Sequence, residues 1–136
     1  MESFLGKYST YFYALLRIIS GLMFAMHGSQ KLFGIPGNKP PMDLPPLLKV
    51  AGVIELVAGL MIALGLLAGY AAFVASGQMA VAFFRAHFKA DAMLPILNGG
   101  ELAVLYCFLF LYIASVGSGT WSLDRLIHRP KPRGTP

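Results

Sequence analysis

The sequence predicts an all-α integral membrane protein, built as an antiparallel four-helix bundle in a single domain. Hydrophobic residues make up 57% of the 136 residues and charged residues only 12%, too few charges to cover a globular surface in water. The mean hydropathy is +0.66. The apolar residues also fall into four runs near the ~20 residues that a membrane-spanning helix needs, with Gly- and Pro-containing breaks between them.

The first predicted span covers residues 12–33. Arg17 lies near its start, and His27 and Lys31 lie near its end, so the centre of this helix is uncharged. The next residues, 34–46, contain five prolines and two glycines. This composition excludes a regular helix and predicts a loop.

The second span is predicted at residues 47–67, and it contains one charge beyond its first turn, Glu55. Small residues recur around this carboxylate at helical spacing: Ala51, Gly52, Ala58, Gly59 and Ala63. A face of small residues lets a membrane helix approach its neighbours closely. We therefore expect Glu55 to point into the bundle and not toward lipid.

The third and fourth spans are predicted at residues 70–87 and 98–117. Only Ala68 and Gly69 separate the second span from the third, and so short a turn makes these two spans antiparallel neighbours. Along the third span, alanines alternate with Gln78 and Arg85 on one face.

Charge and cysteine content limit the function. Residues 1–128 are predicted to be one four-span domain, and the basic, proline-rich residues 129–136 are expected to be disordered. The net charge is +5, from 11 basic and 6 acidic residues. Because much of this positive charge lies in the tail and at Lys7, the positive-inside rule predicts cytoplasmic N- and C-termini. Since the basic residues are explained as an orientation signal, no nucleic-acid partner is predicted. The single cysteine, Cys107, excludes dithiol–disulfide chemistry within one chain.

Polar residues from all four spans are predicted to lie at the same depth, in one half of the bundle. Counting along each helix at about 1.5 Å per residue brings eight of them together. They are His27, Lys31, Glu55, Gln78, Arg85, His87, Asn98 and Glu101. Charged groups inside a membrane are costly unless they are paired or functional, so this convergence is the candidate site.

Structural explanations apply to several of these residues. Lys31, Arg85 and His87 could each extend toward a membrane interface. Gln78 could hydrogen-bond between helices, while Asn98 and Glu101 could cap their own helix. Glu55 could form a purely structural ion pair with Lys31 or Arg85.

Arg17 belongs to the opposite half of the predicted bundle. Asp124 is the natural acidic partner there, because it follows the fourth span on the same side. We predict a structural ion pair between Arg17 and Asp124.

An ordered set of motifs runs from about residue 12 to residue 126. They are Arg17 with Gly21, His27-Gly28-x-x-Lys31, Gly52-x-x-Glu55-x-x-x-Gly59, Gln78-Met79, Ala86-His87, Asn98-Gly99-Gly100-Glu101 and Gly119-x-x-Ser122-Leu123-Asp124. Together they resemble the DoxX family of small bacterial membrane proteins. The resemblance implies a four-helix protein of the bacterial inner membrane, often described as an oxidoreductase subunit. The related DoxD-type proteins resemble membrane subunits of thiosulfate:quinone oxidoreductase.

The leading hypothesis for function is a membrane subunit of a quinone-linked redox system. His27 would donate a hydrogen bond to a quinone carbonyl, and Lys31 or Arg85 would stabilise developing negative charge. Glu55 or Glu101 would carry protons. Gln78, His87 and Asn98 would complete the substrate contacts. The sequence offers no cofactor site within the chain, so a soluble redox partner would supply electrons and quinone would be a substrate.

Two other classes of function remain open. His27, Glu55, His87 and Glu101 are ligand types suited to zinc, manganese or iron, and two histidines on different helices could hold a haem. No short metal-binding motif supports either site. The third class is a non-enzymatic scaffold, or a small-solute transporter that would need a homo-oligomer to form its pathway.

Overall fold

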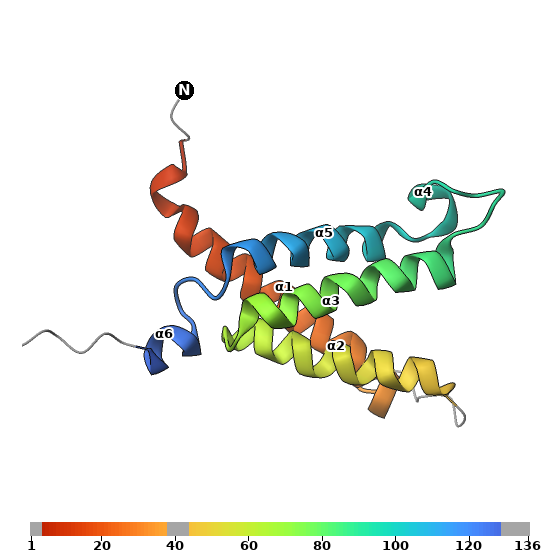
Figure 1. The fold of residues 1–136 in the computed structure, drawn as a ribbon, viewed down its shortest axis with the longest axis horizontal. Helices are drawn as coiled ribbons and strands as arrows, with labels where there is room; N and C mark the ends of the chain where they lie inside the picture. Colours follow the sequence, from red (N-terminus) through yellow and green to blue (C-terminus); the bar gives the residue numbers. More distant parts are fainter. Residues whose placement is uncertain (1–3, 38–43, 129–136) are drawn as a thin grey trace, which may run out of the picture.

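The computed structural model describes residues 4–37 and 44–128, and all of the regular elements in this part of the chain are helices. Its elements are η1 (Gly6–Tyr8), α1 (Ser9–Phe33), α2 (Pro46–Leu64), α3 (Ala68–Ala82), η2 (Phe83–His87), α4 (Pro95–Asn98), α5 (Glu101–Val116) and α6 (Leu123–Ile127) (Figure 1). The prediction of an all-α fold is confirmed. The tail at 129–136 and the centre of the loop at 34–46 lie outside the described residues.

Four long helices build the fold in chain order. Helix α1 packs against α2, α2 against α3, and α3 against α5. Figure 1 shows α2 and α3 joined by a short turn at one end, with α5 lying along α3. The core between them is formed by Phe24, Phe110, Ile62 and Ile113, each at most 1% exposed. Helix α3 contributes Ala71, Ala72, Ala75 and Met79 to the same core.

Helices α1 and α2 approach each other through glycines. A Cβ atom added at Gly28 would lie 2.4 Å from the backbone nitrogen of Leu56, and one added at Gly21 would lie 2.5 Å from that of Ala63. A glycine of α2 is equally close to the backbone of α1, since a Cβ at Gly59 would lie 2.5 Å from the backbone nitrogen of Ala25. Small residues at a helix interface permit this close backbone approach.

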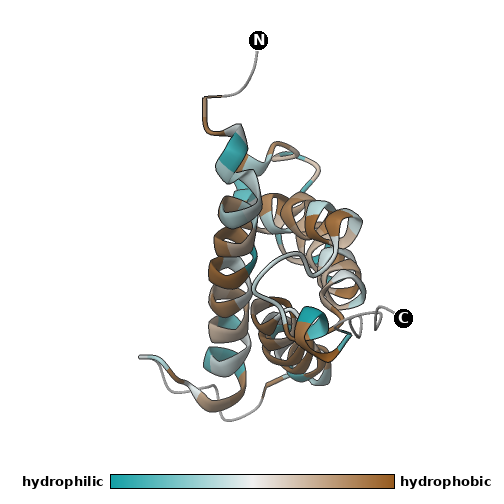
Figure 2. Cartoon of the chain, turned by 90° about the vertical axis from the view of Figure 1, so that its left-hand side faces the viewer, coloured by the Kyte–Doolittle hydropathy of each residue, from teal (hydrophilic) through white to brown (hydrophobic). Residues whose placement is uncertain are grey.

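Much of the long helices is built from apolar residues, as the brown ribbons in Figure 2 show, and many of their large apolar side chains are exposed. Within the described residues, two helical stretches are long and apolar enough to cross a membrane, Gly6–Phe33 and Pro46–Leu64. Helix α5 is apolar but shorter. The chain therefore has the character of a membrane protein, with many large apolar side chains exposed along its helices.

The fourth predicted helix differs from the observed one at its start. The sequence predicts a continuous helix from residue 98, but the chain forms the short helix α4, turns, and begins α5 at Glu101. Gly99 occupies the left-handed region, with a φ of 71°, and this conformation ends α4. Asn98 is thus the last residue of one helix and not the first of the next.

The predicted ion pair between Arg17 and Asp124 is not formed. Arg17 is fully buried, and its guanidinium donates to four backbone carbonyls: Ile62 at 2.6 Å, Ala63 at 2.8 Å, Trp121 at 2.8 Å and Thr120 at 3.3 Å. The only salt bridge in the described residues lies elsewhere. Arg17 therefore fastens the C-terminal end of α2, where the last carbonyls of a helix lack the usual N–H donor four residues on, to the segment that precedes α6.

Asp124 stabilises the turn between α2 and α3. Its carboxylate accepts hydrogen bonds from the hydroxyl of Ser118 and, at 2.9 Å, from the backbone N–H of Leu67. Leu67 precedes α3 and has a positive φ of 48°. The hydrogen bonds from Ser118 and Leu67 hold the pKa of Asp124 below its ordinary value of 3.8.

The variant Asp124→Asn is expected to unfold more easily than the wild type at neutral pH, by about 1 kcal/mol, because two charge-assisted hydrogen bonds are weakened. A carboxylate with a lowered folded-state pKa stabilises the fold above its unfolded-state value of 3.8 and loses this effect as the pH falls through the folded-state pKa. Melting temperatures of both proteins in detergent should therefore converge in acid. The exposed Asp91→Asn is the control; a gap for Asp124→Asn that persists unchanged in acid would contradict the assignment.

Candidate functional site

A cavity of about 230 Å³ lies where α1, α2, α3, η2 and α5 meet. Its polar lining comes from every one of these elements except α3: His27, Lys31, Glu55, His87 and Tyr106. Its apolar lining is Phe24, Met79, Ala82, Leu102 and Ala103, with Gly99 at the edge. The cavity lies in the half of the helical core where the sequence predicts polar residues to converge.

An ion pair between a buried carboxylate and a partly exposed ammonium forms one wall of this cavity. Glu55 is 1% exposed, and its Oε1 accepts a short hydrogen bond from the ammonium of Lys31 and another, of 2.9 Å, from the side-chain amide of Gln78. The same amide of Gln78 donates to the carbonyl of Ala51 at 3.2 Å. A charge removed from water needs such partners, and here α1 and α3 supply them.

Two polar atoms that belong to cavity-lining residues have no hydrogen-bond partner within the described part of the chain. They are the second carboxylate oxygen of Glu55, Oε2, and the hydroxyl of Tyr106. A buried polar atom without a partner costs about 1–3 kcal/mol. The cavity is polar enough and large enough for a water molecule or a small polar group to satisfy both atoms. It is therefore a candidate binding site.

Two imidazoles complete the polar lining. The ring of His27 lies edge-on to that of Tyr106, with centroids 6.3 Å apart. His87 ends the π-helical turn η2, and its Nδ1 lies 3.3 Å from the carbonyl of Asn98. The wider turn of a π-helix shifts the residues that follow it, and such turns are frequent at functional sites. Both rings can exchange a proton with a bound group.

Four of the eight residues predicted to converge do not line the cavity, and one of them, Gln78, instead donates to Glu55. Arg85 and Glu101 are exposed. Asn98 binds backbone instead, since its amide donates to the carbonyl of Ala92 at 2.9 Å and its side-chain oxygen accepts from the N–H of Gly100 at 2.8 Å. Equal depth along a helix does not fix the side of the helix on which a residue lies. Arg85 is two positions from His87, which places it on a different face.

The sequence interpretation did not include Tyr106 among the candidate site residues. Gly99, Leu102, Ala103 and Tyr106 recur at intervals of three and four residues, and Phe110 extends the same row into the core. This spacing marks the inner face of α5 and excludes Glu101 from it. The inner face could therefore have been identified from spacing.

No group of three or more His, Cys, Asp or Glu side chains in the described residues could hold a metal ion. The set proposed from sequence, His27, Glu55, His87 and Glu101, is not assembled, because Glu101 is exposed and one oxygen of Glu55 binds Lys31. The cavity is also smaller than the 300–1,000 Å³ common for ligand pockets. It suits one ring or head group better than a whole macrocycle.

The fold and this cavity define a small helical protein of membrane character with an internal polar site. The DoxX family model matches residues 12–88, and the chain belongs to the DoxX family. A Haemophilus influenzae protein, named only as uncharacterized, is 46% identical over 127 residues, which cover 88% of this chain and 93% of that protein. The Bacillus subtilis protein "Putative oxidoreductase CatD" is 27% identical over 124 residues, 88% of this chain and 90% of CatD. No solved structure matches the chain.

Proposed function

We propose that this protein is the integral membrane subunit of a quinone-linked oxidoreductase system. An antiparallel bundle of four spans would cross the inner membrane, with both termini in the cytoplasm. The spans would be α1, α2, α5, and α3 continued by η2. Family membership and the name given to CatD support an oxidoreductase-associated role. The apolar outer faces of the helices support a position in the bilayer.

The observation that carries the proposal is the buried Oε2 of Glu55 beside a polar cavity. In a low-dielectric site, a carboxylate with one oxygen engaged by Lys31 can take up or release a proton at the other oxygen. The hydroxyl of Tyr106, together with His27, would donate hydrogen bonds to a quinone carbonyl. Glu101, Arg85 and Asn98 have no part in this arrangement.

The proposed reaction balances with one partner. Two electrons from a soluble redox protein and two protons convert a quinone to a quinol, and the reducing protein is oxidised by two electrons. Glu55 would pass protons to a quinone oxygen, while Lys31 would offset the negative charge that develops there. A scaffold that only anchors a partner would gain nothing from a buried carboxylate oxygen without a hydrogen-bond partner.

The variant Glu55→Gln tests this function. It is expected to weaken binding of a short-chain benzoquinone to the protein in nanodiscs by about tenfold or more, because the charged group that binds and protonates the head group is lost. Isothermal titration calorimetry would measure the dissociation constant, and size-exclusion chromatography would check that the variant is folded.

Glu101→Gln is the matched control, because it removes an exposed carboxylate that does not line the cavity. It should leave the dissociation constant unchanged. A wild-type protein that binds no quinone, or a folded Glu55→Gln that binds as tightly as wild type, would refute the proposal.

A further inference from the structure

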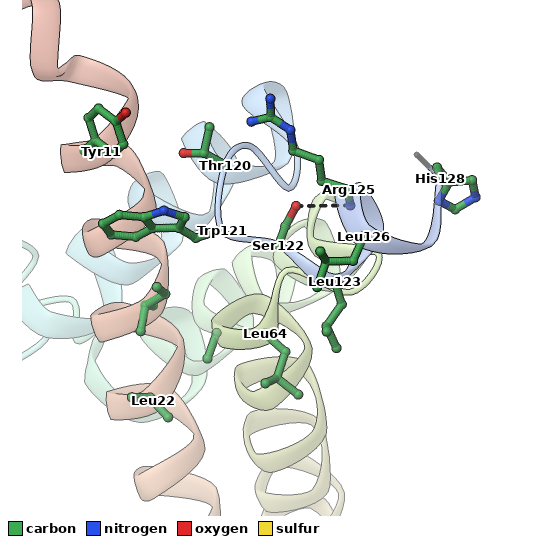
Figure 3. Close-up of a pocket in the computed structure, with 12 residues that line it drawn as sticks. Tyr11, Leu22, Leu64, Thr120, Trp121, Ser122, Leu123, Arg125, Leu126 and His128 are labelled. Carbon is green, nitrogen blue, oxygen red and sulfur yellow. Dashed lines mark hydrogen bonds between the residues drawn. The ribbon is translucent and has the colours of Figure 1, made fainter. Parts of the chain in front are cut away.

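A second and larger hollow lies at the other end of the molecule, far along the helices from the polar cavity. Its volume is about 1,030 Å³, and it lies between the first half of α1, the end of α2 and the segment 120–128 that contains α6. Figure 3 shows its walls, with Leu22 on α1 and Leu64 on α2 below the ring of Trp121. We call this hollow the terminal groove.

The apolar part of the terminal groove has the length of one membrane leaflet. From Tyr11 to Leu22, α1 advances about 16 Å at 1.5 Å per residue. One leaflet contributes half of a hydrocarbon core about 30 Å thick. Ile18 and Leu22 line the groove from α1, and Leu64 lines it from α2. An acyl chain lying along α1 would therefore stay in contact with apolar side chains over its whole depth.

Aromatic side chains mark the level of the head groups at the mouth of the terminal groove. Trp121 is 58% exposed, and its ring centroid lies 5.5 Å from that of Tyr11. Tryptophan and tyrosine gather where hydrocarbon meets the head-group region. With Leu22 further along α1 toward the membrane centre, the two rings fix which end of the groove is the polar one.

The same end of the terminal groove is cationic. Arg125 and His128 line it, and the side chain of Arg125 makes no hydrogen bond or salt bridge to any described residue. The nearest acid in sequence, Asp124, directs its carboxylate to Leu67 and Ser118 instead. A fork of guanidinium donors with no protein acceptor is suited to a phosphate group.

We propose that the terminal groove binds an anionic phospholipid, with an acyl chain along Ile18, Leu22 and Leu64 and its phosphate at Arg125 and His128. A second copy of this chain is a poorer occupant. Docking of two identical grooves by two-fold symmetry would bring Arg125 of one copy toward Arg125 of the other. The proposal rests on the membrane placement given above but not on quinone chemistry.

Native mass spectrometry of delipidated protein, titrated with phosphatidylglycerol or phosphatidylcholine, tests the proposal. We expect tighter retention of phosphatidylglycerol, and Arg125→Gln should weaken it about fivefold, because one cation near a membrane surface contributes about that factor. Leu22→Trp, which fills the apolar wall, should lower retention of both lipids. Lys89→Gln, an exposed cation outside the groove, should change neither.

Several results would overturn this assignment. They are equal retention of the two lipids, full competition by inorganic phosphate alone, or a disulfide between two copies of a Leu22→Cys, Cys107→Ser variant whose formation displaces lipid. A failure of the membrane placement itself would be seen separately, because the protein would then not sediment with membranes. A failure of quinone binding leaves the lipid result unaffected.

Discussion

Replacing Gly28 with valine is expected to separate α1 from α2 and to destabilise the fold by about 3 kcal/mol or more. A Cβ at this position would lie 2.4 Å from the nitrogen of Leu56 and 2.5 Å from the carbonyl oxygen of Gly52. Both atoms belong to backbone, so no side chain can rotate away to relieve the clash. Thermal unfolding in detergent, followed by circular dichroism, would measure the loss as a lower melting temperature.

Gly77→Ala is the matched control for this helix-packing prediction. A Cβ at Gly77 meets nothing within 4 Å, and the residue lies inside α3. Alanine there should be neutral or stabilising, by up to about 1 kcal/mol, because glycine is the poorer helix former. Equal melting temperatures for Gly28→Val and wild type would show that α1 and α2 do not pack as described.

The close approach at Gly28 also sets the geometry of the candidate site. Gly52 lies opposite, and a Cβ there would be 3.3 Å from Cβ of Lys31. Glu55 lies three residues along α2 from Gly52, on the same face, so the glycine contact brings the ammonium of Lys31 against the carboxylate. The site therefore depends on a packing feature and not only on its charged residues.

This part of the structure could be predicted from sequence. Small residues recurring around Glu55 report directly that a neighbouring backbone comes close, and the buried position of Glu55 follows from them. Helical periodicity and apolar runs likewise locate α1 and α2 to within three residues at each end. The spacing of small residues along the sequence is sufficient to predict this helix contact, because the small residues themselves form it.

Other features could not be predicted, because they depend on backbone groups or on rotation about a helix. A search for charge partners suggests Asp124 for Arg17, but peptide carbonyls accept its hydrogen bonds instead. Depth counting groups Glu101 with Glu55 although they face different ways. The break between α4 and α5 requires a left-handed backbone at Gly99. A glycine can adopt this conformation but need not, so the sequence does not predict the break.

Replacing Arg17 with methionine is expected to destabilise the fold by about 3 kcal/mol or more, since carbonyls on two segments lose a charged donor inside the protein. Methionine keeps much of the volume of the arginine side chain, so the loss reports hydrogen bonds more than packing. Arg17→Lys should fall between wild type and methionine, because one ammonium cannot reach both pairs of carbonyls as the planar guanidinium does. Melting temperature and protease cleavage within residues 117–122 are the measurements.

Comparing the melting temperature with the onset of protease cleavage shows whether Arg17 holds one segment locally or stabilises the whole fold. If Arg17 holds the segment before α6, cleavage near Trp121 should begin well below the melting temperature in Arg17→Met. Trp121 has a positive φ of 52°, a conformation that a non-glycine residue keeps only when its surroundings hold it there. Arg85→Met removes an exposed arginine and should alter neither readout. Cleavage that occurs only with global melting would show that other contacts hold the segment and that Arg17 serves α2 alone.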